Sequence, residues 1–237
     1  MVSVEVGGET LVLLAERAAF APRRGTLLVA DVHLGKALSF RRLGVPVPGG
    51  TTRETLTRLS ALVARHGARR LVFLGDLLHS AHAHAASTLD ALARWRERHP
   101  ALALTLVRGN HDQRAGDPPA VLGIEVVDEP LPLGGFALCH HPRAQPGAYV
   151  LAGHEHPCVW VGRGADRLRL PCFRLGARVG VLPAFGAFTG MHPVDADEPG
   201  QRLYAIADDR VLPVARPGGG ARAPAGTTAR RERRAAA

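Results

Sequence analysis

The most constraining feature of this sequence is repeated five times: a short apolar segment runs directly into aspartate, asparagine or histidine. The junctions read ADVH at 30–33, GD at 75–76, GNHD at 109–112, HH at 140–141 and GHEH at 153–156. A simple turn could use Asn110 and Asp112, but it does not require His111 between them. Strand ends are where α/β sheets build their binding sites. We therefore expect five strands that deliver these side chains to one shared centre.

The donor types at these junctions point to metal ions. The side chains offer oxygen and nitrogen atoms, and no cysteine sits at metal spacing among them, which suits Mn, Fe, Zn or similar divalent ions. Six or seven such side chains are too many for one tetrahedral zinc but fit two ions bridged by a carboxylate. On an extended chain, residues two apart point the same way, so we expect Asp31 and His33 to share an ion. The same holds for His154 and His156.

The first half of the chain alternates predicted strands and helices. Strands are expected at Thr26–Ala30, Leu71–Leu74 and Ala101–Val107, after an N-terminal hairpin. Apolar residues at helical spacing indicate helices over 51–66, capped by Thr51 or Thr52, and over 85–98. Alternation of this kind predicts parallel strand pairing.

The second half consists of short apolar segments separated by glycine and proline, with few helix signals. Strand candidates are Ile124–Val127, Phe136–Cys139, Val150–Ala152, Leu168–Phe173, Val179–Leu182, Leu203–Ala207 and Arg210–Val214. They predict a second, mostly antiparallel sheet. The expected fold is an α/β protein: a four-layer α/β/β/α sandwich of two mixed sheets with outer helices. We expect one domain over residues 1–215.

Residues 216–237 differ in composition from the rest of the chain. They hold six arginines against one glutamate, which contributes +5 to a net charge of +9. Rich in Gly and Ala and without an apolar period, this segment is expected to be a disordered basic tail. It could bind a polyanion weakly through phosphate contacts, or be a solvated extension without a task. The remaining charge of about +4 is only modestly basic.

Other features predict a cytoplasmic protein. No stretch of about 18 uncharged apolar residues occurs, so no transmembrane helix is expected. The N-terminus lacks the basic start of a signal peptide and carries Glu5 and Glu9. Three cysteines, Cys139, Cys158 and Cys172, form no CxxC motif and fit a reducing compartment.

The motifs DVH, GDLLH, GNHD, HHP and GHEH, in that order, resemble the motif series of the calcineurin-like binuclear metallophosphoesterases. The match runs from Asp31 to His156, and the ordered series is much more specific than any single motif. The resemblance implies the layered sandwich fold over roughly residues 1–214. It also implies phosphoester hydrolysis with two bound metal ions.

The resemblance assigns a role to each site residue. One metal would be held by Asp31, His33, Asp76 and His156, and the other by Asp76, Asn110, His140 and His154, with Asp76 bridging. His111 would be the catalytic residue that faces the phosphate, and Asp112 would orient it. His141 competes with His140 for the ligand role, and we prefer His140, the first residue after its strand.

A narrower resemblance extends beyond these motifs. ADVHLGKALSFRRLGVPVPGGTT, LVFLGDLLHS and LPCFRLGARVGVLPAFGAFTG are similar to the ligase-associated DNA damage response endonuclease (PdeM) group. This implies DNA as substrate, single-stranded or duplex, with Mn as the expected metal and Fe or Zn as alternatives. It also implies a functional association with a DNA ligase, an Lhr-type helicase and an exonuclease. Glu155 stands where relatives often carry an apolar residue, and we expect no effect on metal binding.

Several further lysine and histidine residues lie near the motifs or elsewhere in the chain. Lys36 and His79 follow ligand motifs closely and are candidate substrate contacts, although Lys36 could be a surface lysine. We expect His82 and His84 to flank a helix. The histidines farther from the motifs are expected to be ordinary surface or core residues; they are His66, His99 and His192.

Three functions fit the sequence. The favoured one is a metal-dependent DNA endonuclease or phosphodiesterase that acts in repair. A phosphoesterase acting on a small nucleotide or other metabolite would share every metal ligand, and a narrow pocket rather than a groove would distinguish it. A non-catalytic nucleic-acid-binding scaffold would be expected to have lost ligands, yet all of them are present. The oligomeric state stays open.

Overall fold

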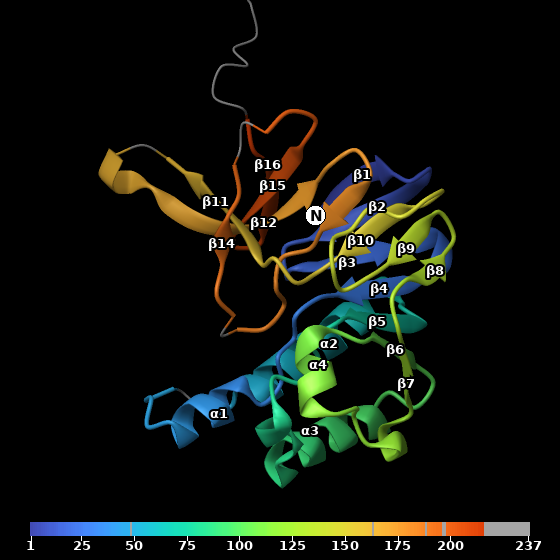
Figure 1. The fold of residues 1–237 in the computed structure, drawn as a ribbon, viewed down its shortest axis with the longest axis vertical. Helices are drawn as coiled ribbons and strands as arrows, with labels where there is room; N and C mark the ends of the chain where they lie inside the picture. Colours follow the sequence, from blue (N-terminus) through green and yellow to red (C-terminus); the bar gives the residue numbers. More distant parts are fainter. Residues whose placement is uncertain (48, 163, 188, 196–197, 216–237) are drawn as a thin grey trace, which may run out of the picture.

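Two β-sheets lie face to face in the computed structural model, and the α-helices gather against the first of them (Figure 1). The structure describes residues 1–47, 49–162, 164–187, 189–195 and 198–215. The predicted basic tail, residues 216–237, lies outside the described residues. The predicted sandwich of two mixed sheets is confirmed. The predicted fourth layer was wrong: in the described part of the chain the core beneath the helices Thr51–His66 and Ala86–Glu97 lies on the first sheet, and no α-helix contributes to the clusters of the second sheet.

The first sheet contains seven strands that are neighbours in chain order. They are β1 (Val2–Val6), β2 (Glu9–Leu14), β3 (Ala18–Ala21), β4 (Thr26–Val29), β5 (Arg70–Leu74), β6 (Ala103–Val107) and β7 (Ile124–Val127). The strands β1 to β4 pair antiparallel, which includes the predicted hairpin, and β4 to β7 pair parallel. The sequence did not predict β3, because its segment AAFA is mostly alanine, a residue that strands disfavour.

The α-helices all fall between residues 36 and 115 in the described part of the chain. They are α1 (Lys36–Arg42), α2 (Thr51–His66), α3 (Ala86–Glu97) and α4 (Asn110–Ala115). The predicted cap of α2 was wrong: Gly50 is the N-cap, and Thr51 and Thr52 are already helical. Both α1 and α4 were missed, because each is too short to show an apolar period. None of the helices in the described ranges has the length and apolar character needed to cross a membrane.

The second sheet is also mixed, with five antiparallel and three parallel pairings. Its strands are β8 (Leu131–Leu133), β9 (Phe136–Leu138), β10 (Tyr149–Ala152), β11 (Pro157–Val161), β12 (Leu168–Leu175), β13 (Val179–Val181), β14 (His192–Pro193), β15 (Arg202–Ala207) and β16 (Arg210–Pro213). The order is β14-β11-β12-β13-β10-β9-β8, with β15 between β12 and β16. Of these, β8, β11 and β14 were not predicted. Helical structure described after residue 115 is limited to the 3-10 turns Ala120–Leu122 and Gly164–Asp166.

Alternating side chains explain why the first sheet lies between two cores. Along β4, Leu27 and Val29 belong to the core beneath α2 and α3, whereas Leu28 and the following Ala30 belong to the core between the sheets. The next strand, β5, repeats this alternation. Both strands are therefore buried on two faces, which fixes the position of the polar residues that follow their carboxyl ends.

Candidate metal centre

The polar residues at the five strand junctions meet in one place. Asp31 and His33 follow β4, Asp76 follows β5, and Asn110 begins α4 directly after β6. The second sheet contributes His140 from the segment after β9, and His154 and His156 from the segment after β10. The structure thus brings together all seven predicted metal ligands, which are Asp31, His33, Asp76, Asn110, His140, His154 and His156.

One group of donor atoms forms around the end of β4. The Nε2 atom of His156 lies 3.4 Å from Oδ1 of Asp31. The Nε2 atom of His33 lies 3.7 Å from Oδ2 of Asp76. Asp31, His33 and His156 present ligand atoms that all lie within 4.8 Å of one another, a spacing that one ion can span.

A second group forms around His140. Its Nε2 atom lies 2.9 Å from Oδ1 of Asn110, 3.1 Å from Nδ1 of His154 and 3.6 Å from Oδ1 of Asp76. Asp76 therefore faces both groups, with Oδ2 toward His33 and Oδ1 toward His140. A carboxylate in that position can be shared between two cations.

The backbone at the site is sharply bent. Positive φ occurs at seven described residues other than glycine: Arg17, Asp31, His33, Asp76, His154, His156 and Asp208. Five of them are predicted ligands, and backbone strain of this kind clusters at functional sites. We expected Asp31 and His33 to share an ion because residues two apart on an extended chain point the same way. That reason was wrong, since neither residue is extended: φ is 53° at Asp31 and 49° at His33. Each residue turns toward the site individually.

Two glycines of the motifs leave the space that site side chains fill. A Cβ atom at Gly75, where φ is 78°, would lie 2.1 Å from Nδ1 of His140. At Gly109, a Cβ atom would lie 2.3 Å from Oδ1 of Asp76. Real Cβ atoms essentially never approach within 3.0 Å, so both positions require glycine.

The chemistry of the donor atoms fits divalent cations. The Nε2 atom of His33 is buried and has no hydrogen-bond partner among the described residues. Burial lowers the pKa of His33 to about 2, so the ring stays neutral and keeps a lone pair. In His140, Nδ1 lies 3.1 Å from the carbonyl oxygen of Leu74, which places the proton there and leaves Nε2 as an acceptor. Nε2 then faces Oδ1 of Asn110, another acceptor, and a shared cation would explain that arrangement.

Asp112 has a different role from the predicted one. Its Oδ2 atom accepts the backbone amides of Asp76 at 2.7 Å and Gly109 at 3.0 Å, and its Oδ1 accepts that of Leu78 at 3.1 Å. The prediction that Asp112 orients the ring of His111 was wrong, because its carboxylate binds backbone amides and Nδ1 of His111 binds the carbonyl oxygen of His79 instead. Fully buried, Asp112 joins the loop after β5 to the start of α4.

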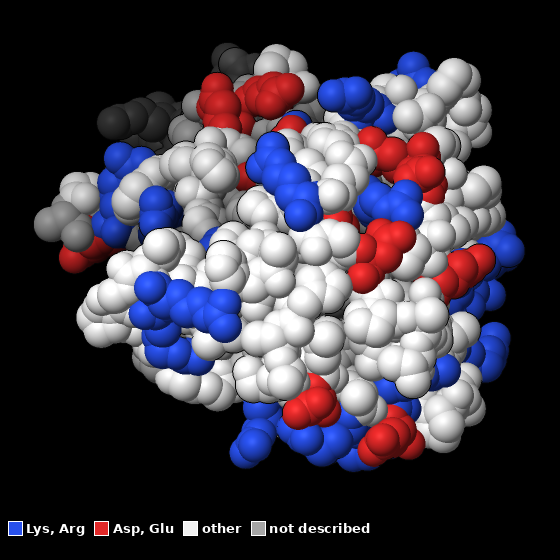
Figure 2. All heavy atoms as spheres, turned by 60° about the horizontal axis from the view of Figure 1, so that its bottom comes forward, with Lys and Arg blue, Asp and Glu red and all other residues white. Residues whose placement is uncertain are grey.

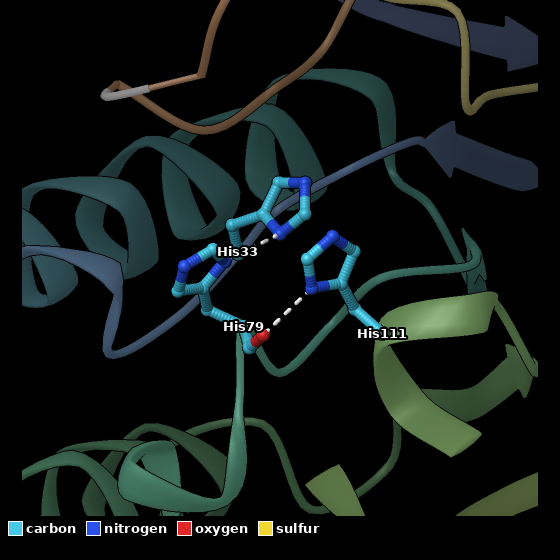
Figure 3. Close-up of side chains that lie close together, drawn as sticks. All are labelled: His33, His79 and His111. Carbon is cyan, nitrogen blue, oxygen red and sulfur yellow. Dashed lines mark hydrogen bonds between the residues drawn. The ribbon is translucent and has the colours of Figure 1, made fainter. Parts of the chain in front are cut away.

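The ring of His111 is oriented by His79 instead (Figure 3). Its Nδ1 lies 2.7 Å from the carbonyl oxygen of His79, and the two rings stack with centroids 5.1 Å apart. Since a carbonyl only accepts, Nδ1 carries the proton and Nε2 is the atom available to a ligand. That Nε2 lies 4.0 Å from Oδ2 of Asp76, and the side chain is 31% exposed. His111 therefore stands at the rim of the site, in reach of solvent and metal ligands alike.

Both candidate substrate contacts lie beside the site. The Nδ1 atom of His79 is 3.3 Å from Nδ1 of His33, and burial lowers the pKa of His79 to about 4. Lys36 is half-buried, which lowers its pKa, and the charges of Asp31 and Asp76 oppose that shift. It lines a cavity of about 20 Å³ next to His33.

The neighbouring histidines at 140 and 141 differ in environment. His140 is fully buried among the donor atoms, whereas the side chain of His141 is 26% exposed and its Nδ1 lies 2.8 Å from Oε1 of Glu129. Glu129 also accepts the backbone amides of both histidines, at 2.7 and 2.9 Å. Sequence reasoning missed Glu129, because only the fold shows that this loop passes the end of β9.

The remaining histidines have ordinary surroundings, with one exception. His66 packs on Phe20, and Nε2 of His99 lies 2.7 Å from the Ser60 hydroxyl. His82 and His84 lie in the 3-10 turn Ala81–His84 that precedes α3, so they flank a helix as expected. The exception is His192, whose Nδ1 lies 3.1 Å from the carbonyl oxygen of Glu155, within the GHEH loop.

Comparison with solved structures gives matches to a nuclease and to a phosphoesterase. Nuclease MPE from Pseudomonas putida matches with a TM-score of 0.81 and 46% sequence identity, over 90% of this chain and 99% of that chain. Yfce, a phosphoesterase from E. coli, matches with a TM-score of 0.40 and 16% identity, over 80% of this chain and 98% of that chain. No family model matches the sequence, and no curated protein does.

Proposed function

We propose that this chain is a metal-dependent DNA endonuclease. The premise is that it belongs to the calcineurin-like metallophosphoesterases and to the family of nuclease MPE. The observation that carries this proposal is the placement of Asp76, whose two carboxylate oxygens face two separate groups of donor atoms. Two adjacent cations are the arrangement used for phosphoryl displacement.

Each donor group would hold one divalent ion, with Asp76 shared. The first ion would be held by Asp31, His33, Asp76 and His156, and the second by Asp76, Asn110, His140 and His154. When bound, the ions polarise a water molecule and neutralise charge on the phosphoryl group. The carboxylate, amide and imidazole donors suit Mn, Fe or Zn, and the motif resemblance favours Mn among them.

His111 is the proposed catalytic residue of the chain itself. Its Nδ1 is held by the carbonyl of His79, so Nε2 points to the place where a phosphodiester would bind near Asp76. In the protonated ring, Nε2 can give a proton to the departing sugar oxygen, or hydrogen-bond a phosphoryl oxygen. His79 and Lys36 border the same place and are the proposed substrate contacts.

The relative at 46% identity is a nuclease, which favours a polymeric substrate over a small metabolite. On the face in Figure 2, Lys and Arg side chains are interspersed with Asp and Glu around a broad uncharged area. DNA affinity should therefore depend on local contacts and weaken as salt rises.

The decisive experiment is incubation of the full-length chain with plasmid DNA, single-stranded DNA and nucleotides across a panel of divalent metals. We expect cleavage of at least one DNA form with Mn, and about two ions per chain by elemental analysis. Asp76→Ala should abolish cleavage and lower the metal content at both positions. Hydrolysis of nucleotides without cleavage of any DNA would favour the metabolite phosphoesterase instead. One ion or none at saturating metal would contradict the binuclear centre.

A role in DNA repair, alongside a DNA ligase, an Lhr-type helicase and an exonuclease, is part of this proposal and derives from the motif resemblance alone. A cytoplasmic location is supported by the cysteines. All three, Cys139, Cys158 and Cys172, are buried free thiols.

A further inference from the structure

A two-stranded ribbon begins at the metal centre and projects away from the second sheet (Figure 1, upper left). It is formed by β11 and the first half of β12, which pair antiparallel. The first residue of β11, Pro157, directly follows the predicted ligand His156. The ribbon is thus continuous with the site.

The ribbon presents an exposed tryptophan between arginines. The chain has two tryptophans: Trp95 is fully buried in the core, and Trp160 is 44% exposed. Arg169 pairs directly opposite Trp160, and its Cζ lies 6.0 Å from the ring centroid. Arg167 is two residues before it, so it lies on the same face of the ribbon, with Cζ 5.0 Å from the ring.

We propose that this face of the ribbon is a second nucleic-acid-binding site, at which Trp160 stacks on an unpaired base and Arg167 and Arg169 contact neighbouring phosphates. Aromatic side chains that stack on bases, flanked by cations, are how proteins hold single strands. The proposal rests on the proposed function, because it concerns the same DNA strand that reaches the metal centre.

The position of the ribbon fits a strand that spans both sites. Trp160 is four residues beyond His156, about 13 Å along an extended strand. That is the length of about four stacked nucleotides. Moreover, Arg174 of β12 forms an ion pair with Glu155, between the two histidines of the GHEH loop. The ion pair holds the base of the ribbon against the metal-binding loop.

The opposite face of the ribbon is chemically different. Val161 and Leu168 pair across the strands and are 39% and 63% exposed. An apolar surface of that kind would suit a second copy of the chain, whereas the guanidinium groups around Trp160 are complementary to phosphate. We therefore assign the nucleic acid to the Trp160 face alone.

The test uses Trp160 as its own reporter in the full-length chain, without divalent ions so that DNA is not cut. An oligothymidylate of twelve nucleotides should quench the fluorescence of the exposed Trp160, while the fluorescence of the buried Trp95 stays constant. A thymidine dinucleotide should quench it far less, because it cannot reach both sites. No change with the longer oligonucleotide would overturn the proposal.

Variants then assign the binding to one face. By anisotropy with a labelled oligonucleotide, Trp160→Ala should bind roughly tenfold more weakly and Trp160→Phe should restore most of the affinity. Arg167→Ala with Arg169→Ala should reduce the salt dependence of binding. The matched control is Leu168→Ala on the opposite face, which should bind as the unaltered chain does. Equal affinity for Trp160→Ala, or an effect on self-association instead, would overturn the proposal.

Hydrolysis of bis(4-nitrophenyl) phosphate with Mn separates this inference from the proposed function. Trp160→Ala should hydrolyse this small ester at the unaltered rate and cleave long single-stranded DNA roughly tenfold more slowly at limiting substrate. Normal rates of Trp160→Ala on both substrates would overturn the proposal that the ribbon binds DNA and would leave the nuclease proposal in place. Quenching of Trp160 fluorescence by DNA, without hydrolysis of any ester by the unaltered chain, would contradict the proposed function and support DNA binding by the ribbon.

Discussion

The carboxylate of Asp112 lies 2.7 Å from the backbone amide of Asp76, the residue that faces both groups of metal donors. The same carboxylate holds the amides of Leu78 and Gly109. Asp112 therefore shapes the loop that presents the shared carboxylate, and its effect on the metals is exerted through the backbone.

Asp112→Ala should lower the free energy of unfolding by roughly 3 kcal/mol, because three buried amides lose their acceptor. Metal content should fall as well, since Asp76 is no longer held. Asp112→Asn keeps one oxygen for two of the amides, so it should be milder. Urea denaturation of the metal-free chain and elemental analysis measure the two effects. If Asp112→Ala had normal stability and metal content but slower catalysis, the original prediction that Asp112 orients the ring of His111 would be supported instead.

Adjacent histidines should respond in opposite ways. His140→Ala removes a fully buried ring that faces Asn110, His154 and Asp76, so we expect about one ion per chain and at least 100-fold slower cleavage. His141→Ala removes a partly exposed ring bound to Glu129. It should keep both ions and lose about tenfold in rate or less. Elemental analysis of the two variants decides the matter, and the reverse result would make His141 the ligand.

The contact between Glu9 and Arg24 predicts a pH dependence of stability. The side chain of Glu9 is 7% exposed, and its pKa is lowered by the hydrogen bond from Arg24 and by the amide of Gly135. A depressed folded-state pKa stabilises the fold above the ordinary value of 4.5, and this contribution is lost as pH falls through the folded-state pKa. Glu9→Gln should therefore cost about 2 kcal/mol at pH 7 and much less at pH 3.

Unfolding in urea at several pH values measures this difference. Glu5→Gln is the matched control, because Glu5 lies on the neighbouring strand and is exposed. It should change stability little at any pH. A constant difference between the Glu9→Gln variant and the unaltered chain from pH 7 to pH 3 would show that charge on Glu9 is not what stabilises the contact.

Local sequence patterns were sufficient to predict the parts of the fold whose apolar residues recur at regular spacing. The helix at 51–66 was predicted apart from its N-cap, because Leu56, Leu59 and Leu62 recur at helical spacing and all become buried. The convergence of the strand ends followed from the same logic, since buried parallel strands must end at one edge. Neither inference needed knowledge of a distant contact.

The remainder depends on contacts that only the folded chain contains. Nothing in the sequence near Asp112 distinguishes a carboxylate that binds backbone amides from one that orients a ring. Glu129 reaches His140 and His141 because its loop passes the end of β9. The strand β11 was missed because Pro157 to Val161 shows no clear alternation, and so the exposure of Trp160 could not be anticipated.

The last prediction separates His111 from the residues that would hold metal. Its Nδ1 is held by the carbonyl of His79, so Nε2 is the only ring nitrogen available to a substrate. A sugar oxygen leaves as a strongly basic alkoxide and needs a proton, whereas nitrophenolate leaves with little help. General acid catalysis is typically worth about 10²–10⁴-fold. His111→Ala should therefore keep both ions, lose most DNA cleavage and keep much more of its activity on bis(4-nitrophenyl) phosphate.

Steady-state rates on the two substrates, with metal content measured on the same preparation, give three distinct readings. A large loss on DNA and a small one on the nitrophenyl ester supports proton donation by His111. Equal losses on both would mean that Nε2 stabilises charge on the phosphoryl group in the transition state, because that demand does not depend on the leaving group. Loss of an ion would mean that His111 is itself a ligand, which its position 4.0 Å from Oδ2 of Asp76 would then explain.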